Sequence, residues 1–310
     1  MTRARETVVV VSAGIPNTGY LAEASAERIS MYEASDNALT DRFRRALDDR
    51  QAVIVLRPAW LPVPKPLRMA RALLESDRIA DVPLSVPPLA LSLIADQLAF
   101  LAPYVAAGRL ASLAGTLSRE ISAGAWVRSV AKLEHLPVGI SHHLASYAPG
   151  GGFVVSVVPE PGIQRLPRTS SVMAAGFRPA GPVQMLAAQE GADHGWFLEV
   201  INRSFQPSSV TLTGAQPLSR GYWGSGKYLE FVALSGHPDA LSRAVSATRC
   251  RPCGWCGEPI AMPCCPFCGA AQPNPPVIVP SEPAPGPVRL RPVPTEALRS
   301  VPTEARSEVS

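Results

Sequence analysis

Residues 7–19 read Thr7-Val-Val-Val-Val-Ser-Ala-Gly-Ile-Pro-Asn-Thr-Gly19, a β-branched run followed at once by a loop of small residues and turn formers. A helical stretch rich in Ala and Glu continues to Met31, and a second helical stretch lies at 41–49. The next apolar run, Val53-Ile-Val-Leu56, is typical of a strand buried on both faces. This order of strand, loop, helix and strand predicts an α/β fold for the N-terminal part.

The middle of the chain predicts helices first and short strands after them. Residues 89–135 carry apolar side chains at helical spacing, with Trp126, Val130 and Leu133 in the last part of the stripe, and they predict two or three packed helices. Beyond Pro137 short β-like runs alternate with Gly, Pro, Asn and Ser. These runs lie at 138–142, 153–158, 196–201, 210–213 and 228–234. They predict a small antiparallel β domain.

Composition completes the domain plan. The chain has 310 residues, which exceeds what one small core needs, and 33 of them are proline. From 272 to 310 prolines are frequent and no aromatic residue occurs, so this tail cannot form a buried core. The tail contains a near-repeat, in which residues 301–307 resemble residues 293–300. We therefore predict an α+β multidomain protein. Its parts are an α/β and helical domain at 1–136, a β domain at 137–249, a cysteine-rich module at 250–271 and a disordered tail at 272–310.

Charge and hydropathy limit the compartment and the partners. The net charge of +4 arises from 29 basic and 25 acidic residues spread along the chain, so nucleic acid is not required as a partner. The apolar run Val8–Val11 is too short for the core of a signal peptide. The segment 89–107 approaches the length of a membrane span, but it contains Asp96, Gln97 and Pro103, and its spacing suits a buried helix. We predict a cytoplasmic protein with no membrane partner.

All six cysteines lie between Cys250 and Cys268, which favours metal ligation over a disulfide scaffold. Two Cys-x-x-Cys pairs, Cys253/Cys256 and Cys265/Cys268, are each followed by glycine and stand eight residues apart. Such a turn directs both thiolates at one ion, and the glycine tolerates the positive φ that the turn needs. Four thiolates then complete a tetrahedron with no open position, which predicts a structural ion. The two cysteines left over, Cys250 and Cys264, are alternative ligands.

The segment 250–269 resembles the short zinc-ribbon modules at the ends of many bacterial proteins, on the strength of its paired Cys-x-x-Cys-Gly knuckles. The resemblance implies a structural Zn²⁺ held by Cys253, Cys256, Cys265 and Cys268. Two alternatives stay open: iron, because Cys265–Gly269 also resembles a rubredoxin knuckle, and free or redox-active thiols without metal.

Three other segments are candidate sites. The loop Gly14–Gly19 lies between a predicted strand and helix, where it either binds an anion or serves as a plain turn. We interpret the adjacent His142 and His143 as surface histidines rather than as an active site, because neighbouring strand residues point to opposite faces. The glycine-rich segment 219–228 is a possible binding loop, whose aromatic and basic residues either stack on a ligand or fold back on the sheet. Its candidate residues are Arg220, Tyr222, Trp223, Lys227 and Tyr228.

These features favour a non-enzymatic interaction or assembly protein over an enzyme, because the sequence supplies no acid–base pair. The hypothesis gives the ribbon a docking role, with Trp255 and Phe267 as its contact surface for a protein partner. The alternative is a nucleic-acid-binding protein that uses the ribbon and the Arg220–Tyr228 loop, although residues 250–269 carry no net charge. A third possibility is an enzyme that uses the Gly14–Gly19 loop. No small-molecule substrate is evident from the sequence.

Overall fold

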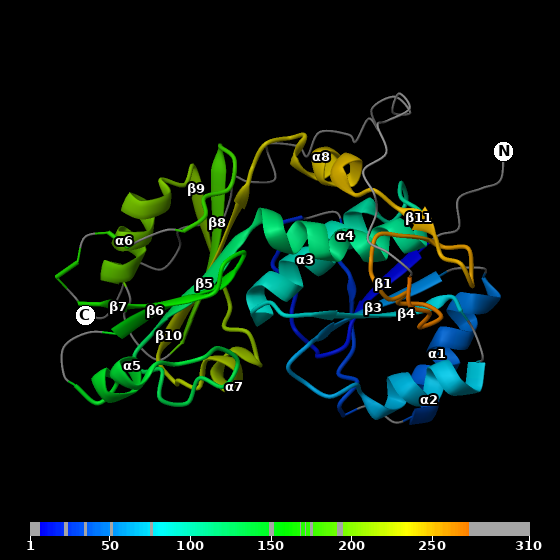
Figure 1. Ribbon diagram of the computed structural model, residues 1–310, viewed down its shortest axis with the longest axis horizontal. Helices are drawn as coiled ribbons and strands as arrows, with labels where there is room; N and C mark the ends of the chain where they lie inside the picture. The colour runs from blue at the N-terminus through cyan, green and yellow to red at the C-terminus, as the bar shows by residue number, and fades with distance from the viewer. Residues whose placement is uncertain are drawn as a thin grey trace, which may run out of the picture.

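Two β-sheets, each flanked by helices, lie side by side along the long axis of the molecule (Figure 1). The computed structural model describes residues 7–21, 24–33, 36–49, 52–74, 77–148, 152–167, 169–170, 172–173, 176–190 and 195–272. The predicted tail, apart from Gln272, lies outside the described residues, and so does its near-repeat.

The first sheet is parallel and has the strand order β2-β1-β3-β4. Its strands are β1 (Thr7–Val11), β2 (Glu27–Arg28), β3 (Ala52–Pro58) and β4 (Ile79–Leu84). Its helices are α1 (Asp36–Asp48), α2 (Lys65–Leu74), α3 (Pro88–Leu101) and α4 (Ala107–Glu120). Alternate residues of β3 point to opposite faces of the sheet. Val53 packs in a hydrophobic cluster with residues of α1 and α2, and Ile54 packs in another cluster with residues of α3 and α4. The predicted α/β fold of the N-terminal part is confirmed.

The second sheet is mixed and has the strand order β7-β6-β5-β10-β8-β9. Its strands are β5 (Ser122–Val127), β6 (Gly152–Val158), β7 (Gly162–Leu166), β8 (Val183–Glu190), β9 (Ser209–Thr213) and β10 (Tyr228–Ser235). Its helices are α5 (Ile140–Ala145), α6 (Gly195–Phe205), α7 (Ser219–Trp223) and α8 (Ala240–Ala247). Helix α6 packs on one face, α5 and α7 pack on the other, and α8 packs on α4 of the first half. Among the described strands of this sheet, β8 and β9 form the only parallel pair.

The structure corrects four expectations for this half. The boundary does not fall at 136, because β5 pairs with β6 and β10 and so begins the second sheet. Every residue of β5 is buried, so the apolar stripe through Trp126 belongs to a central strand and not to a helix. The run 196–201 forms α6, since Phe197, Val200 and Ile201 lie on one side of a helix. The expected strand at 138–142 overlaps α5 instead. The second half is therefore a helix-covered mixed sheet rather than an antiparallel β domain.

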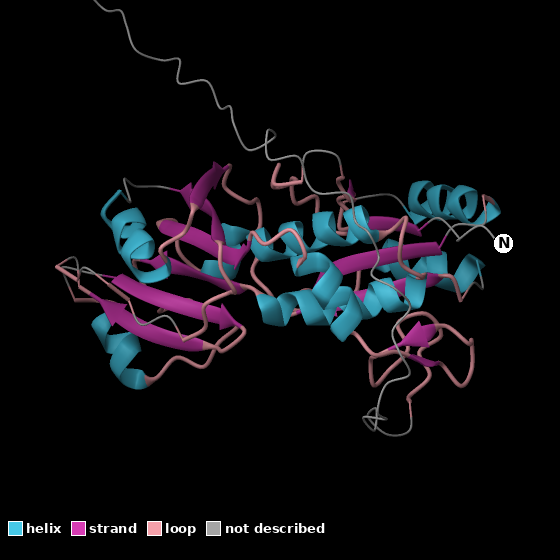
Figure 2. Cartoon of the chain, turned by 90° about the horizontal axis from the view of Figure 1, so that it is seen from above, coloured by secondary structure: helices cyan, strands magenta, loops and turns pink. Residues whose placement is uncertain are grey.

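Helix α3 joins the two halves. Figure 2 shows helices in the centre of the molecule, between the strands of the two sheets. One hydrophobic cluster includes Val11 of β1, Leu93 of α3 and Val232 of β10, so the core is continuous through this junction. No helix among the described residues has both the length and the apolar character that crossing a bilayer demands. Segment 89–107 is instead mostly the buried helix α3.

Candidate functional site

The four cysteines of the two knuckles come together. Their Sγ atoms all lie within 4.8 Å of one another, whereas Cys250 and Cys264 are not part of this group. The loops close as the sequence pattern predicts: the N–H of Gly257 donates to the Cys253 carbonyl, and Gly257 and Gly269 both have positive φ, 76° and 78°. The set offers four sulfur ligands at a spacing that can hold one metal ion.

Local hydrogen bonds favour the thiolate form at one of these ligands. Burial raises the pKa of the Cys253 thiol, but backbone N–H groups of Cys256 and Trp255 outweigh it and lower this pKa to about 6. The side-chain amide of Gln272 also donates to Cys253 Sγ, over 3.2 Å. Burial raises the pKa of Cys256. Four thiols this close ionise together only when a cation compensates their charge, which is the chemistry of a metal site.

The cysteine module is packed onto the first sheet. Strand β4 is an edge strand, and its Asp81 N–H donates to the carbonyl of Pro266 over 2.9 Å. The Arg71 guanidinium of α2 donates to the carbonyl of Phe267, whose side chain is only 2% exposed. On α4, the Ser112 hydroxyl accepts a hydrogen bond from the N–H of Ala261. Figure 1 shows this segment, in orange, against the first half of the molecule. The module therefore covers the free edge of β4.

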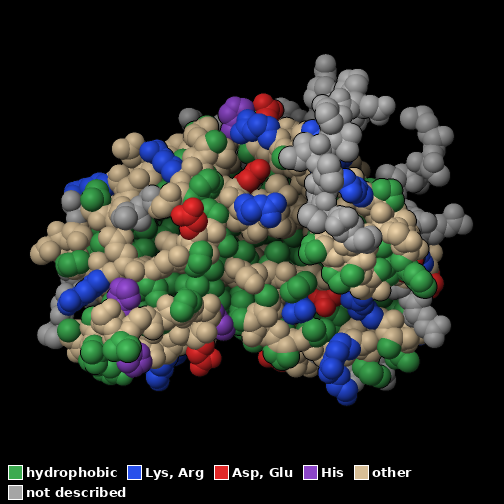
Figure 3. All heavy atoms as spheres, viewed as in Figure 1, with side chains coloured by type: hydrophobic (Ala, Val, Ile, Leu, Met, Phe, Trp, Pro, Cys, Tyr) green, Lys and Arg blue, Asp and Glu red, His purple; other side chains and the backbone are tan. Residues whose placement is uncertain are grey.

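This packing corrects the expected docking surface of the module. Phe267 is buried against the first half, so its side chain is not available to a partner. Of the two expected contact residues, Trp255 alone is exposed, at 84%. On the face shown in Figure 3, Lys and Arg side chains are interspersed with Asp and Glu, without a single-sign field that would attract nucleic acid.

The aromatic residues of the predicted binding loop fold back into the core. Tyr222, Trp223 and Tyr228 are buried, and only Arg220 and Lys227 of the five candidates reach solvent. The Tyr222 ring stacks on His135 with centroids 4.7 Å apart and contacts Trp60 at 4.5 Å. The structure thus brings these aromatics together as part of the junction between the halves and not as a ligand-binding tip.

The Gly14–Gly19 loop is bound to α3. The backbone N–H of Thr18 and that of Ala26 donate to the buried carboxylate of Asp96, which also pairs with Arg28 at 2.6 Å. The Ser92 hydroxyl donates to the carbonyl of Pro16. An acidic side chain of the protein thus occupies the position that an anionic ligand would need, and the loop serves as a turn.

His142 and His143 lie on the short helix α5. Their rings contact different aromatic neighbours: His142 lies against Phe153, and His143 against Tyr147. They therefore do not form a joint site.

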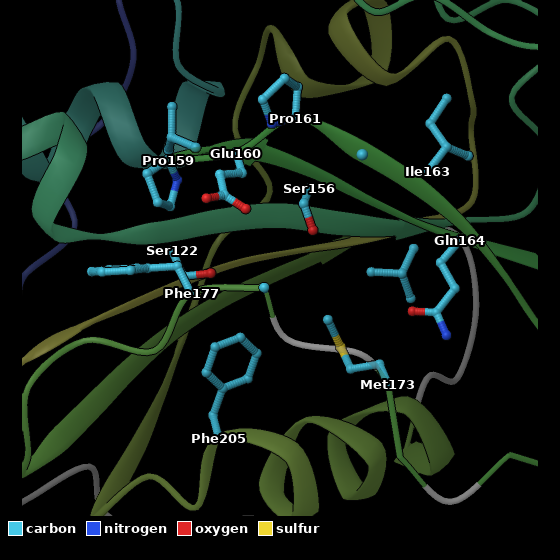
Figure 4. Close-up of a pocket in the computed structure, with 14 residues that line it drawn as sticks. Ser122, Ser156, Pro159, Glu160, Pro161, Ile163, Gln164, Met173, Phe177 and Phe205 are labelled. Carbon is cyan, nitrogen blue, oxygen red and sulfur yellow. The ribbon is translucent and has the colours of Figure 1, made fainter.

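A cavity of about 300 Å³ lies in the second half, between the sheet and the end of α6. Val154 and Ser156 of β6 line the sheet side. Figure 4 shows Met173 and Phe205 on the opposite side and Phe177 beside Ser122. The cavity is also lined by Ser122, Val158, Pro159, Glu160, Pro161, Gly162, Ile163, Gln164 and Gly176. Sequence reasoning missed this site because its wall comes from β5, β6, β7, α6 and the segment before β8. A weak signal was present: Ser156 is a polar residue inside an otherwise apolar strand.

The chain thus combines a two-sheet α/β fold with a cavity in its second half. The chain is similar in fold to a DegV family protein from Corynebacterium glutamicum, with a TM-score of 0.53 and 15% identity over 76% of this chain and 99% of the other. It is also similar to a DegV family protein from Thermus thermophilus described as binding fatty acid, with a TM-score of 0.52 and 11% identity over 74% and 99% of the two chains. No protein-family model and no curated protein matches the sequence.

These likenesses correct the functional expectations. The docking hypothesis and its nucleic-acid alternative are wrong, because both gave the cysteine module the central role. The fold shared with a fatty-acid-binding protein instead covers about three quarters of the chain, and the module is packed onto it. The expectation that no small-molecule substrate is evident is contradicted as well, because a neighbour of this fold is described as binding fatty acid.

Proposed function

We propose that this protein binds a single-chain lipid in the cavity beside α6. The observation that carries the proposal is the cavity itself: its volume of about 300 Å³ and its wall, which combines apolar side chains with polar groups, are typical of small-molecule sites. The description of the Thermus thermophilus neighbour as a fatty-acid-binding protein supports the same ligand class.

The two sides of the cavity suit the two parts of such a lipid. Phe205, Phe177 and Met173 offer aromatic and thioether surface to an alkyl chain, and methionine adapts to chains of different shape. The hydroxyls of Ser122 and Ser156 project from the sheet side in Figure 4, where they can hydrogen-bond a polar head group. Burial of the chain supplies the affinity, at about 0.8 kcal/mol per methylene group.

Filling the cavity tests the proposal. Gly162 lines it, and a Cβ added there meets no atom within 4 Å, so Gly162→Phe is expected to place its ring in the cavity without a backbone clash. The variant should weaken binding of a neutral fluorescent alkyl probe at least thirtyfold, or about 2 kcal/mol, in an equilibrium titration.

Gly214→Phe is the matched control, because Gly214 is equally open and lies outside the cavity. It should bind the probe like the wild type, and both variants should keep the wild-type circular dichroism spectrum. Undiminished probe binding by a folded Gly162→Phe variant would contradict the proposal.

The second element of the proposal is that the four-cysteine cluster holds a structural Zn²⁺. Cys253, Cys256, Cys265 and Cys268 complete a tetrahedral thiolate set, which leaves no position for water or substrate and so favours a structural over a catalytic ion. The role we assign to the ion is to keep the cover of the β4 edge folded, because a segment of about 20 residues has too little apolar surface to fold without it.

A further inference from the structure

We propose that strand β9 pairs with the β9 strand of a second copy of this chain, antiparallel and about a two-fold axis at Thr211. The inference goes beyond the proposed lipid-binding function and does not depend on it. It concerns the outer edge of the second sheet.

Strand β9 lies at the end of that sheet, with β8 on its inner side (Figure 1). No backbone hydrogen bond joins its outer side to another segment of the described chain. Its apolar side chains are exposed as well, since Val210 is 37% exposed and Leu212 is 60% exposed. An edge strand of this kind presents a row of unpaired N–H and C=O groups, and a further strand can extend the sheet there.

The hydrogen bonds of β8 show which backbone groups of β9 point outward. The carbonyl of Val183 accepts a hydrogen bond from the N–H of Ser208, so the odd-numbered residues of β8 direct their backbone groups toward β9. Met185 is one of these residues, and its partner in the parallel register is Val210. In a parallel ladder a residue bonds to the two neighbours of its partner and not to the partner itself. The N–H and C=O groups of Val210, and of Leu212 by the same alternation, therefore face away from β8.

The other edges of the two sheets are protected against such pairing. The cysteine module covers β4, β2 is only two residues long, and β7 carries the exposed Arg165. Strand β9 has none of these devices. From 204 to 219 the sequence contains no acidic, basic or histidine residue, and no proline occurs within the strand itself. Since charges, prolines and covering segments are the usual means of preventing edge-to-edge pairing, β9 is an edge that can pair.

The sequence of β9, Ser-Val-Thr-Leu-Thr, is self-complementary in the antiparallel direction. A two-fold axis at Thr211 sets this residue opposite the partner's Thr211, and it sets Val210 opposite the partner's Leu212. The valine and leucine of each such pair then exchange two backbone hydrogen bonds, and their side chains meet on one face of the extended sheet. The threonine side chains meet on the other face. No charges of like sign face each other, so a second copy fits this edge without repulsion.

The same geometry sets the size and the strength of the assembly. Two-fold pairing uses the β9 edge of both copies, so the assembly closes at a dimer and does not grow into a fibre. The five residues of β9 extend over about 17 Å, which is short for an interface of standard size. The dimer is therefore weak, and it forms in the micromolar range of protein concentration.

Sedimentation equilibrium of the full chain tests the inference. The wild type should show a reversible equilibrium between monomer and dimer at concentrations up to about 100 μM. Leu212→Lys should raise the dissociation constant of the dimer at least tenfold, because it brings a charged group to the paired edge. Leu73→Lys is the matched control: Leu73 of α2 is also 60% exposed, and its substitution should leave the dissociation constant unchanged.

A charge exchange at Thr211 tests the register of the pairing. Thr211→Lys and Thr211→Glu each set two like charges opposite each other across the axis, so each variant alone should be monomeric. An equimolar mixture of the two should dimerise at least as tightly as the wild type. A wild type that stays monomeric over the whole concentration range, or a Leu212→Lys variant that dimerises like Leu73→Lys, would overturn the inference. A mixture of the Thr211 variants that remains monomeric would overturn it as well. None of these outcomes bears on lipid binding.

Discussion

Cys265→Ser is expected to lower the thermal unfolding midpoint by about 10 °C or more and to remove the bound metal. The substitution takes one of the four thiolates from the proposed Zn²⁺ site, and structural zinc supplies on the order of 10 kcal/mol in isolated finger peptides. Part of that energy remains in the packing of Phe267, so we expect a loss of several kcal/mol, at roughly 2–4 °C per kcal/mol for a domain of this size. Scanning calorimetry and elemental analysis measure the two effects.

The adjacent cysteine supplies a matched control. Cys264 is exposed and lies outside the four-sulfur group, so Cys264→Ser should keep one metal ion per chain and the wild-type midpoint. Hydrogen exchange shows where the structure is destabilised. The Asp81 amide donates to Pro266, and its protection from exchange should fall in Cys265→Ser because the cysteine module no longer stays packed on β4. Wild-type protein that contains no stoichiometric metal, or a Cys265→Ser variant as stable as Cys264→Ser, would contradict the prediction.

The predictions that the structure confirms rest on local sequence patterns. The β-branched run before the Gly14–Gly19 loop and the core Val53–Leu56 become β1 and β3, because strands buried on both faces need continuous apolar sequence. The spacing and following glycines of the knuckles likewise bring the four sulfurs together, since each Cys-x-x-Cys turn is a local geometry. In both cases the information lies within a few residues.

Predictions failed where tertiary packing decided the outcome. The run 196–201 is apolar and aromatic enough for a strand, yet it forms part of α6. The apolar side of this helix packs on the second sheet and covers it. The sequence of β5 predicts a helix because a short apolar run fits both periodicities, and the partners that make it a strand lie about 30 and 100 residues away in the chain. The cavity was invisible for the same reason: its wall assembles from five segments that only the folded sheet brings together.

The carboxyl group of Glu230 makes the stability of the junction depend on pH. Glu230 lies on β10 with no exposed surface, accepts a hydrogen bond from Leu89 N–H of α3, and accepts another from the Ser219 hydroxyl of α7. Burial raises its pKa from 4.5 to about 7, against the lowering effect of these hydrogen bonds. The titratable groups that face it, Tyr222 and Tyr228, ionise only at alkaline pH, and burial raises the pKa of both.

The direction of the effect follows from proton uptake. Between pH 4.5 and pH 7 the folded protein holds a proton on Glu230 that the unfolded chain has lost, so this group's contribution to stability falls as the pH rises and is lowest above pH 7. Glu230→Gln keeps an acceptor for Leu89 and a neutral side chain at every pH. We therefore expect the free energy of unfolding of the variant, relative to wild type, to rise by about 3 kcal/mol between pH 4.5 and pH 8, as measured by urea titration.

Glu199→Gln serves as the control, because its exposed carboxylate should leave the pH profile of the wild type unchanged. If the variant and the wild type keep a constant difference in unfolding free energy across this range, folding does not raise the pKa of Glu230. The hydrogen bonds from Leu89 and Ser219 would then offset burial, and the junction between the two sheets would hold a carboxylate that is charged at neutral pH rather than a group that titrates near neutrality.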